Sequence, residues 1–96
     1  MQTERIVALL RDHKKDIYTY FKVKEIGVFG SVARHEQTET SDIDFLVDFA
    51  NDASLFDLVR LGSYLEEMFQ RPVDIVPRES LRPELRSSVR EELIVV

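Results

Sequence analysis

Two aspartates separated by a single residue, Asp42 and Asp44, are the side chains of this sequence best suited to chemistry. They open the stretch 41–49, where apolar and acidic residues alternate strictly, and this alternation predicts a strand. Side chains two residues apart on a strand share a face and lie about 6.5 Å apart along the backbone. Two carboxylates at that spacing repel each other unless a cation lies between them, and Mg²⁺ is the divalent ion that best accepts such ligands.

A third carboxylate, Asp74, lies in the short apolar run 73–76, on the face opposite Val73 and Ile75. If this second strand lies beside the first, Asp74 joins the pair. Three such acids can hold two metal ions about 3.5–4 Å apart, an arrangement used for in-line phosphoryl transfer. A lone Asp-x-Asp is more often a solvated strand face. Asp48, about 13 Å along the strand from Asp44, is interpreted as solvent-exposed rather than as a ligand.

A glycine turn precedes the acids. Gly30 and Ser31 end an apolar run at residues 25–29, and a glycine there permits a tight turn and the close approach of a ligand to the backbone. Ser31 is predicted to cap a short helix that runs through Arg34. The free N–H groups at the start of this helix could bind an anion. A polar loop, 35–40, leads to Ser41, and its acids Glu36 and Glu39 are interpreted as loop charges.

The remaining elements provide the frame that must position these residues. Thr3 is predicted to cap a helix whose apolar face continues to Phe21 and includes His13, interpreted as a packing residue. A capping box at Ser54 and Asp57 predicts a helix that continues to about residue 70, with Leu55 and Val59 on its apolar face. A further helix is predicted after Pro83, and a final strand or docked tail at 93–96. This order predicts a single α/β (α+β) domain, 1–96, with helices packed on a small mixed sheet.

Composition excludes several classes of protein. The 96 residues contain no cysteine, which excludes a disulfide framework and is consistent with a cytoplasmic protein. A net charge of −5 disfavours binding to long nucleic acids, whose affinity depends on phosphate neutralisation. No apolar run approaches the roughly 20 residues of a membrane-spanning helix, and charges interrupt the apolar residues of the N-terminus, so no signal peptide is expected.

Two segments together carry a family resemblance. Gly30-Ser31-Val32-Ala33-Arg34, followed by Ser41-Asp42-Ile43-Asp44-Phe45-Leu46-Val47, resembles the GSxAR…SDIDxxV signature of the nucleotidyltransferase superfamily that includes DNA polymerase β. The short chain resembles the minimal nucleotidyltransferases in particular. The fold that this implies is the palm-like nucleotidyltransferase fold. One departure is His35, where many members have glycine.

The resemblance implies the transfer of AMP from ATP to a hydroxyl group, with two Mg²⁺ ions as cofactors. Gly30 and Ser31 would hold the triphosphate, while Asp42 and Asp44 would bind both ions. Asp74 would complete the second metal site and help to deprotonate the acceptor. The resemblance also implies that Arg34 and Ser41 bind the nucleotide. Each has a structural role as the alternative: a salt bridge for Arg34 and a contact that steadies the loop for Ser41.

The acceptor implied by the resemblance is a protein. Minimal nucleotidyltransferases are commonly antitoxins that adenylylate a tyrosine of a partner HEPN-domain toxin, and a partner can close the open site of so small a transferase. A homodimer or a hetero-oligomer with the toxin is compatible with this interpretation. Two alternatives stay open: a transferase acting on a small molecule such as an aminoglycoside, and a non-catalytic antitoxin that neutralises its toxin by binding.

Overall fold

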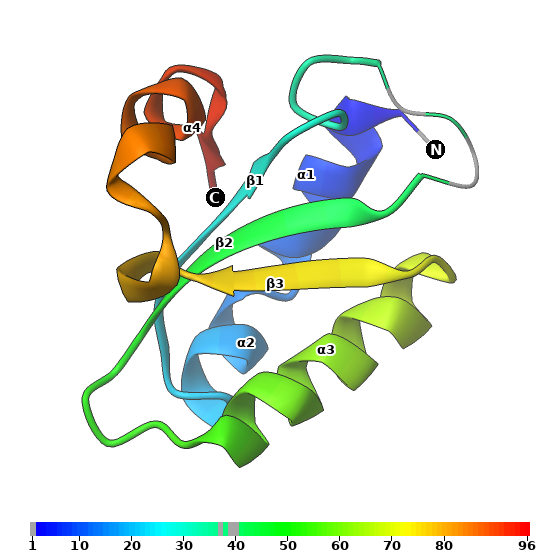
Figure 1. Cartoon of the computed structure of the whole chain (residues 1–96). Coiled ribbons are helices and arrows are strands. Elements are labelled where there is room, and N and C mark those ends of the chain that lie inside the picture. Colours follow the sequence, from blue (N-terminus) through cyan, green and yellow to red (C-terminus); the bar gives the residue numbers. More distant parts are fainter. Residues whose placement is uncertain (1, 37, 39–40) are drawn as a thin grey trace.

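The fold is built on a mixed sheet, seen in a computed structural model that describes residues 2–36, 38 and 41–96. Its strands lie in the order β3-β2-β1-β4 (Figure 1). Strand β2 is antiparallel to β1 and parallel to β3, and β4 is antiparallel to β1. The strands are β1 Val23–Phe29, β2 Ile43–Phe49, β3 Val73–Pro77 and β4 Ile94–Val95.

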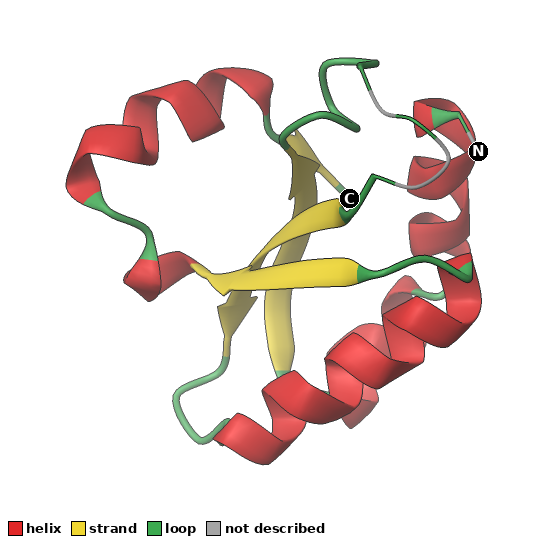
Figure 2. Cartoon of the chain, turned by 45° about the vertical axis from the view of Figure 1, so that its right-hand side comes forward, coloured by secondary structure: helices red, strands yellow, loops and turns green. Residues whose placement is uncertain are grey.

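Helices lie on both sides of this sheet. Helices α1, α2 and α3 cover one face, whereas α4 lies on the opposite side, next to the C-terminus (Figures 1 and 2). Short 3₁₀ turns connect β3 to α4. The helices are α1 Thr3–Asp12, α2 Lys14–Tyr20, α3 Leu55–Phe69 and α4 Arg86–Glu92, and the 3₁₀ turns are η1 Arg78–Ser80 and η2 Pro83–Leu85.

The core lies between the sheet and helices α1 to α3. Ile43, Phe45 and Val47 of β2 are completely buried, whereas the alternate residues of that strand are partly exposed. Burying each of these side chains contributes about 1.5–3 kcal/mol to folding. The strict alternation of 41–49 therefore predicted the strand and its buried face correctly, and it leaves Asp44 on the face that is not covered by the three helices.

Strand register brings three distant segments together at one end of the sheet. Phe29, the last residue of β1, pairs with Asp44 of β2. On the other side of β2, Asp44 pairs with Asp74 of β3. The end of β1, the start of β2 and the start of β3 are therefore neighbours, as the prediction for Asp74 required.

The N-terminal helix differs from its prediction. The chain forms two helices that meet at His13, which has φ −107° and ψ 8° and whose Nδ1 lies 2.8 Å from the Leu9 carbonyl oxygen. His13 packs edge-on against Tyr64 of α3, as expected for a packing residue. The cap prediction for Thr3 was wrong: it lies in the first helical turn, and its buried hydroxyl donates to the Val32 carbonyl. This bond ties α1 to the turn that follows β1.

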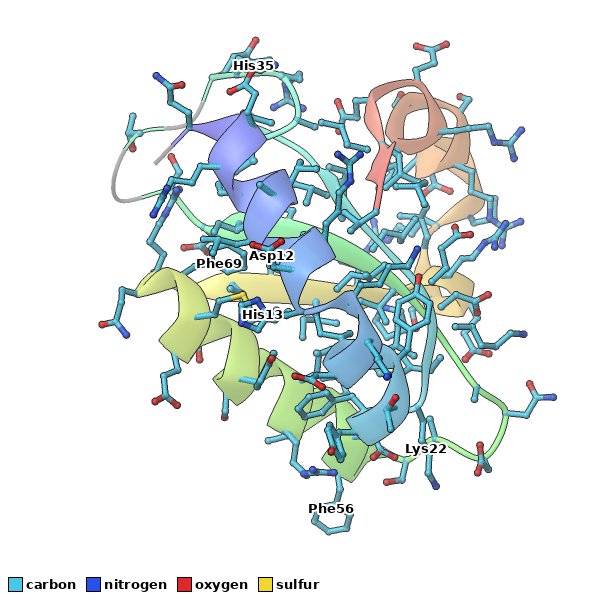
Figure 3. All side chains as sticks on the ribbon, turned by 180° about the vertical axis from the view of Figure 1, so that it is seen from behind. Asp12, His13, Lys22, His35, Phe56 and Phe69 are labelled. Atoms are coloured by element: carbon cyan, nitrogen blue, oxygen red, sulfur yellow. The ribbon has the colours of Figure 1, made fainter. Side chains whose placement is uncertain are left out.

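Two further predictions need correction and two are confirmed. Residues 31–34 form consecutive turns rather than a helix. Leu55 and Val59 are exposed on α3, as is Phe56, which points away from the body of the protein (Figure 3). The capping box is present, with the Ser54 amide donating to Asp57 Oδ2 at 2.8 Å. The chain does end in a short strand, β4.

Across the described residues, none of the helices combines the length and the apolar character needed to span a bilayer.

Candidate active site

The turn after β1 lies directly against Asp44. Gly30 has φ +74°, a conformation that L side chains rarely adopt. The Arg34 amide donates to the Gly30 carbonyl at 3.1 Å, and the Glu36 amide donates to the Ser31 carbonyl at 2.8 Å. A Cβ atom on Gly30 would overlap the Asp44 carboxylate. Two features therefore favour glycine at position 30: the positive φ angle and the carboxylate that lies where a Cβ atom would be.

The three predicted acids lie at the start of two neighbouring strands. Asp44 and Asp74 are register partners, and Asp42 is exposed just before β2. Partial burial raises the pKa of Asp44, and the negative charges of Asp74 and Asp42 raise it further. The charges of Asp74 and Asp42 therefore disfavour the ionised form of Asp44.

The three acids do not form a complete set of metal ligands by themselves. Over the residues that the structure describes, no group of three or more acidic, histidine or cysteine side chains is arranged to hold a metal ion. The donor chemistry nevertheless fits Mg²⁺, which commonly binds one or two protein carboxylates and takes its other ligands from phosphate and water. Asp42, Asp44 and Asp74 are the residues that would hold it.

A residue that the sequence analysis missed, Glu92, completes the turn. It ends α4, and its Oε1 accepts a hydrogen bond from the Gly30 amide at 2.9 Å. Its Oε2 lies 2.9 Å from Nη1 of Arg34, whose Nε also bonds Glu36 at 3.1 Å. The salt-bridge alternative for Arg34 is thus realised. Glu92 lies 62 residues from Gly30 along the chain, so no local pattern could have indicated this contact.

A second missed residue, Arg71, holds the loop that precedes the acids. Its buried guanidinium donates from Nε to the Ser41 carbonyl at 3.1 Å and from Nη2 to the Thr38 carbonyl at 3.1 Å. The Ser41 hydroxyl accepts from the Thr38 amide at 2.9 Å, which gives Ser41 the loop contact expected of it. Residues 37, 39 and 40, including the predicted loop charge Glu39, lie outside the described residues.

His35 explains why the resembled family has a glycine at this position. Its φ is +59°, in the left-handed region, so the turn keeps a glycine-like backbone although the residue is not glycine. Its imidazole is exposed, with Nδ1 3.9 Å from Glu4 Oε1. His35 therefore adopts the left-handed conformation that a glycine would adopt at little cost.

The mixed sheet, the glycine turn and the acids at the start of β2 and β3 define an enzyme of the nucleotidyltransferase class. The nucleotidyltransferase domain model matches residues 10–96. The chain belongs to this family, and the resemblance to minimal nucleotidyltransferases is confirmed.

Individual relatives agree with this assignment. The chain is 42% identical over 93 residues to the protein adenylyltransferase MntA of Thermococcus cleftensis, covering 97% of this chain and 94% of the relative. A solved structure assigned as a minimal nucleotidyltransferase superposes with a TM-score of 0.83 at 38% identity, over 98% of this chain and 95% of that one. A complex of tri-AMPylated Shewanella oneidensis HEPN toxin with MNT antitoxin gives a TM-score of 0.61 at 25% identity, over 97% and 66% of the respective chains.

Proposed function

We propose that this chain transfers AMP from ATP to a tyrosine hydroxyl of a HEPN-domain toxin in the cytoplasm and so acts as the toxin's antitoxin. The observation that carries the proposal is the position of Asp44, which contacts the Gly30 turn on one side and pairs with Asp74 on the other. This arrangement brings groups suited to phosphate next to groups suited to a divalent cation.

Each site residue then has a role in binding. The Gly30 and Ser31 amides and the Ser31 hydroxyl hold the triphosphate, and Arg34 adds positive charge beside them. Asp42, Asp44 and Asp74 are the residues that would hold two Mg²⁺ ions. When bound, these ions neutralise phosphate charge and lower the pKa of the acceptor hydroxyl. Ser41 acts through the loop, because its hydroxyl is bonded to the Thr38 amide.

The transfer exchanges one phosphorus–oxygen bond for another. The acceptor oxygen attacks the α-phosphorus of ATP, and the bond to the bridging oxygen of pyrophosphate breaks. Asp74 takes the proton of the acceptor hydroxyl, and the products are an AMP ester and pyrophosphate. No histidine is needed as a base, consistent with the location of His13 on the far side of the sheet, among α1, α2 and α3 (Figure 3).

A protein acceptor fits the open face of the site. Asp42 is exposed, so the acids are accessible to a side chain presented by a partner. The similarity to an AMPylated HEPN toxin complex and to a protein adenylyltransferase supports a toxin tyrosine as the acceptor. The partner would also cover the exposed end of the sheet at which Asp42 lies.

The test is incubation of the chain with labelled ATP, Mg²⁺ and a HEPN-domain toxin, followed by mass spectrometry of both proteins. We expect AMP on a tyrosine of the partner. Asp44→Asn should abolish labelling, whereas Asp48→Asn should retain it. Asp48 is a matched control, because it lies on the same strand face. It is partly buried rather than solvent-exposed as predicted, and it forms an ion pair with Arg78 at 3.7 Å.

Two results would overturn parts of the proposal. Full labelling by Asp44→Asn would exclude the assigned site. Neutralisation of the toxin that survives in an Asp42→Asn, Asp44→Asn double variant would show that binding, not transfer, silences the partner. Labelling of a small molecule in the absence of the partner would replace the protein acceptor with a low-molecular-weight one.

A further inference from the structure

A carboxylate of the chain itself occupies the anion-binding groups of the glycine turn. Glu92 accepts from the Gly30 amide through Oε1 and contacts the Arg34 guanidinium through Oε2, both at 2.9 Å. An amide and a guanidinium that converge on one anion are the donors expected for a phosphate. The Glu92 carboxylate therefore bonds the same two donors that a phosphate group would use.

The position of Glu92 is fixed by the end of the fold. After one intervening residue, β4 pairs with Gly27 and Val28 of β1. Gly27 makes this approach possible, because a Cβ atom there would lie 2.9 Å from the Ile94 carbonyl oxygen. The backbone of Glu92 is thus held beside the turn, while its side chain is 21% exposed and lies partly at the surface.

We propose that Glu92 is an internal competitor of the triphosphate and sets the affinity of the site for ATP. This inference rests on the proposed function. ATP must displace the Glu92 carboxylate from Gly30 and Arg34 before its phosphates can bind there. The carboxylate returns when pyrophosphate leaves, and its return favours product release.

Two features of the turn make this exchange feasible. Arg34 keeps its second bond, from Nε to Glu36 at 3.1 Å, so its guanidinium stays beside the turn when Glu92 withdraws. The Gly30 amide, by contrast, has a single N–H, which cannot serve the carboxylate and a phosphate in full at the same time. Glu92 is also a negative charge near Asp44, and therefore opposes a phosphate by repulsion as well as by occupancy.

The test compares Glu92→Gln with Glu91→Gln. Both remove one negative charge from the end of α4, but Glu91 is exposed and makes no described contact with the turn. Binding of α,β-methylene-ATP with Mg²⁺ is measured by isothermal titration calorimetry. We expect about tenfold tighter binding for Glu92→Gln, since a charge-assisted contact no longer has to be broken. Glu91→Gln should match the wild type.

Kinetics separate competition from a merely structural role. In the AMP-transfer assay, Glu92→Gln should lower the KM for ATP without raising kcat, and inhibition by added pyrophosphate should become stronger. A structural role alone would instead lower kcat and thermal stability. If Glu92→Gln fails to fold, Glu92→Asp provides the same test, because it keeps the charge but withdraws the carboxylate from Gly30 by one methylene.

The outcomes distinguish this inference from the proposed function. If the wild type binds the analogue and the folded Glu92 variant binds it equally or more weakly, the competition is overturned and the proposed function stands. If neither protein binds any nucleotide, the proposed function fails as well. Tighter binding by Glu91→Gln to the same extent would reduce the effect to general charge and also overturn the inference.

Discussion

Gly30 and Asp44 lie in contact, and any side chain at position 30 would overlap the Asp44 carboxylate. The contact follows from strand pairing, since Phe29 at the end of β1 faces Asp44 at the start of β2. The phosphate-binding turn and the central acid are therefore one structural unit, and a change in either one displaces the other.

Replacing Gly30 with alanine should damage both stability and activity. The φ of +74° and the overlap with Asp44 each oppose a Cβ atom, so we expect a loss of about 1–3 kcal/mol in the free energy of unfolding. AMP transfer should fall at least about tenfold, because the turn and the carboxylate can no longer occupy their positions together. Urea denaturation and the labelling assay measure the two effects.

Gly62→Ala is the matched control. Gly62 lies inside α3, and an added Cβ would meet only Ile75 Cδ1, at an ordinary 3.7 Å. Alanine should stabilise the helix there by about 0.5–1 kcal/mol and leave transfer unchanged. Equal stability and activity in Gly30→Ala and the wild type would contradict the contact described for Gly30.

Asp44 should make the protein less stable as the pH rises. Burial and the charges of Asp74 and Asp42 raise its pKa above the ordinary value of 3.8, so the folded state retains the proton over a pH range in which the unfolded chain has lost it. Stability therefore falls as the pH rises from about 3.8 through the raised pKa. Above that range, Asp44→Asn should be more stable than the wild type, and the difference should shrink towards pH 3.8.

Urea titrations of both proteins between pH 3.5 and 8 test this sign. Asp48→Asn serves as the comparison, because its carboxylate is paired with Arg78 and should not gain stability when neutralised. Added Mg²⁺ should stabilise the wild type at neutral pH more than it stabilises Asp44→Asn. A variant that is less stable than the wild type at every pH would show that the carboxylate is not held against repulsion.

The strands and the predicted acids could be read from the sequence because their signals are local. A period of two along 41–49 gives both the strand and its faces, and the same pattern around Asp74 places this acid opposite Val73. The pairing of Asp44 with Asp74 remained conditional, since the sequence states no strand order. Parallel pairing of β2 and β3 fulfils that condition.

The remainder depends on contacts between residues far apart in the chain. Glu92 reaches Gly30 across 62 residues and Arg71 reaches Ser41 across 30, and each belongs locally to an ordinary polar stretch. The predicted helix at 31–34 was wrong for a related reason. Thr3 of α1 and Glu92 of α4 hold the turn through hydrogen bonds. These are tertiary contacts, which local helix propensity does not indicate.

Arg71 should be required for activity although it is not expected to contact substrate. Its guanidinium bonds the Thr38 and Ser41 carbonyls, which hold the chain just before Asp42. Lysine cannot reproduce the forked donor geometry, so Arg71→Lys should cost about 1–3 kcal/mol of stability and lower AMP transfer. Arg82→Lys, at an exposed position, is the control. Wild-type kcat and KM in Arg71→Lys would show that the contacts of Arg71 with the loop do not position the site.

His35 offers a test of the backbone of the turn alone, because its side chain is exposed and its contact with Glu4 is long. At φ +59°, the left-handed conformation costs a residue with a Cβ atom about 1–2 kcal/mol, and glycine avoids that cost while losing more entropy on folding. His35→Gly should therefore raise the free energy of unfolding by up to about 1 kcal/mol and retain transfer activity.

His35→Val, with a branched Cβ that fits this region worst, should lower stability and weaken ATP binding, because the Arg34 that precedes it would shift. Urea denaturation of both variants gives the comparison. A less stable glycine variant would show that the imidazole, rather than the backbone angle, matters at this position.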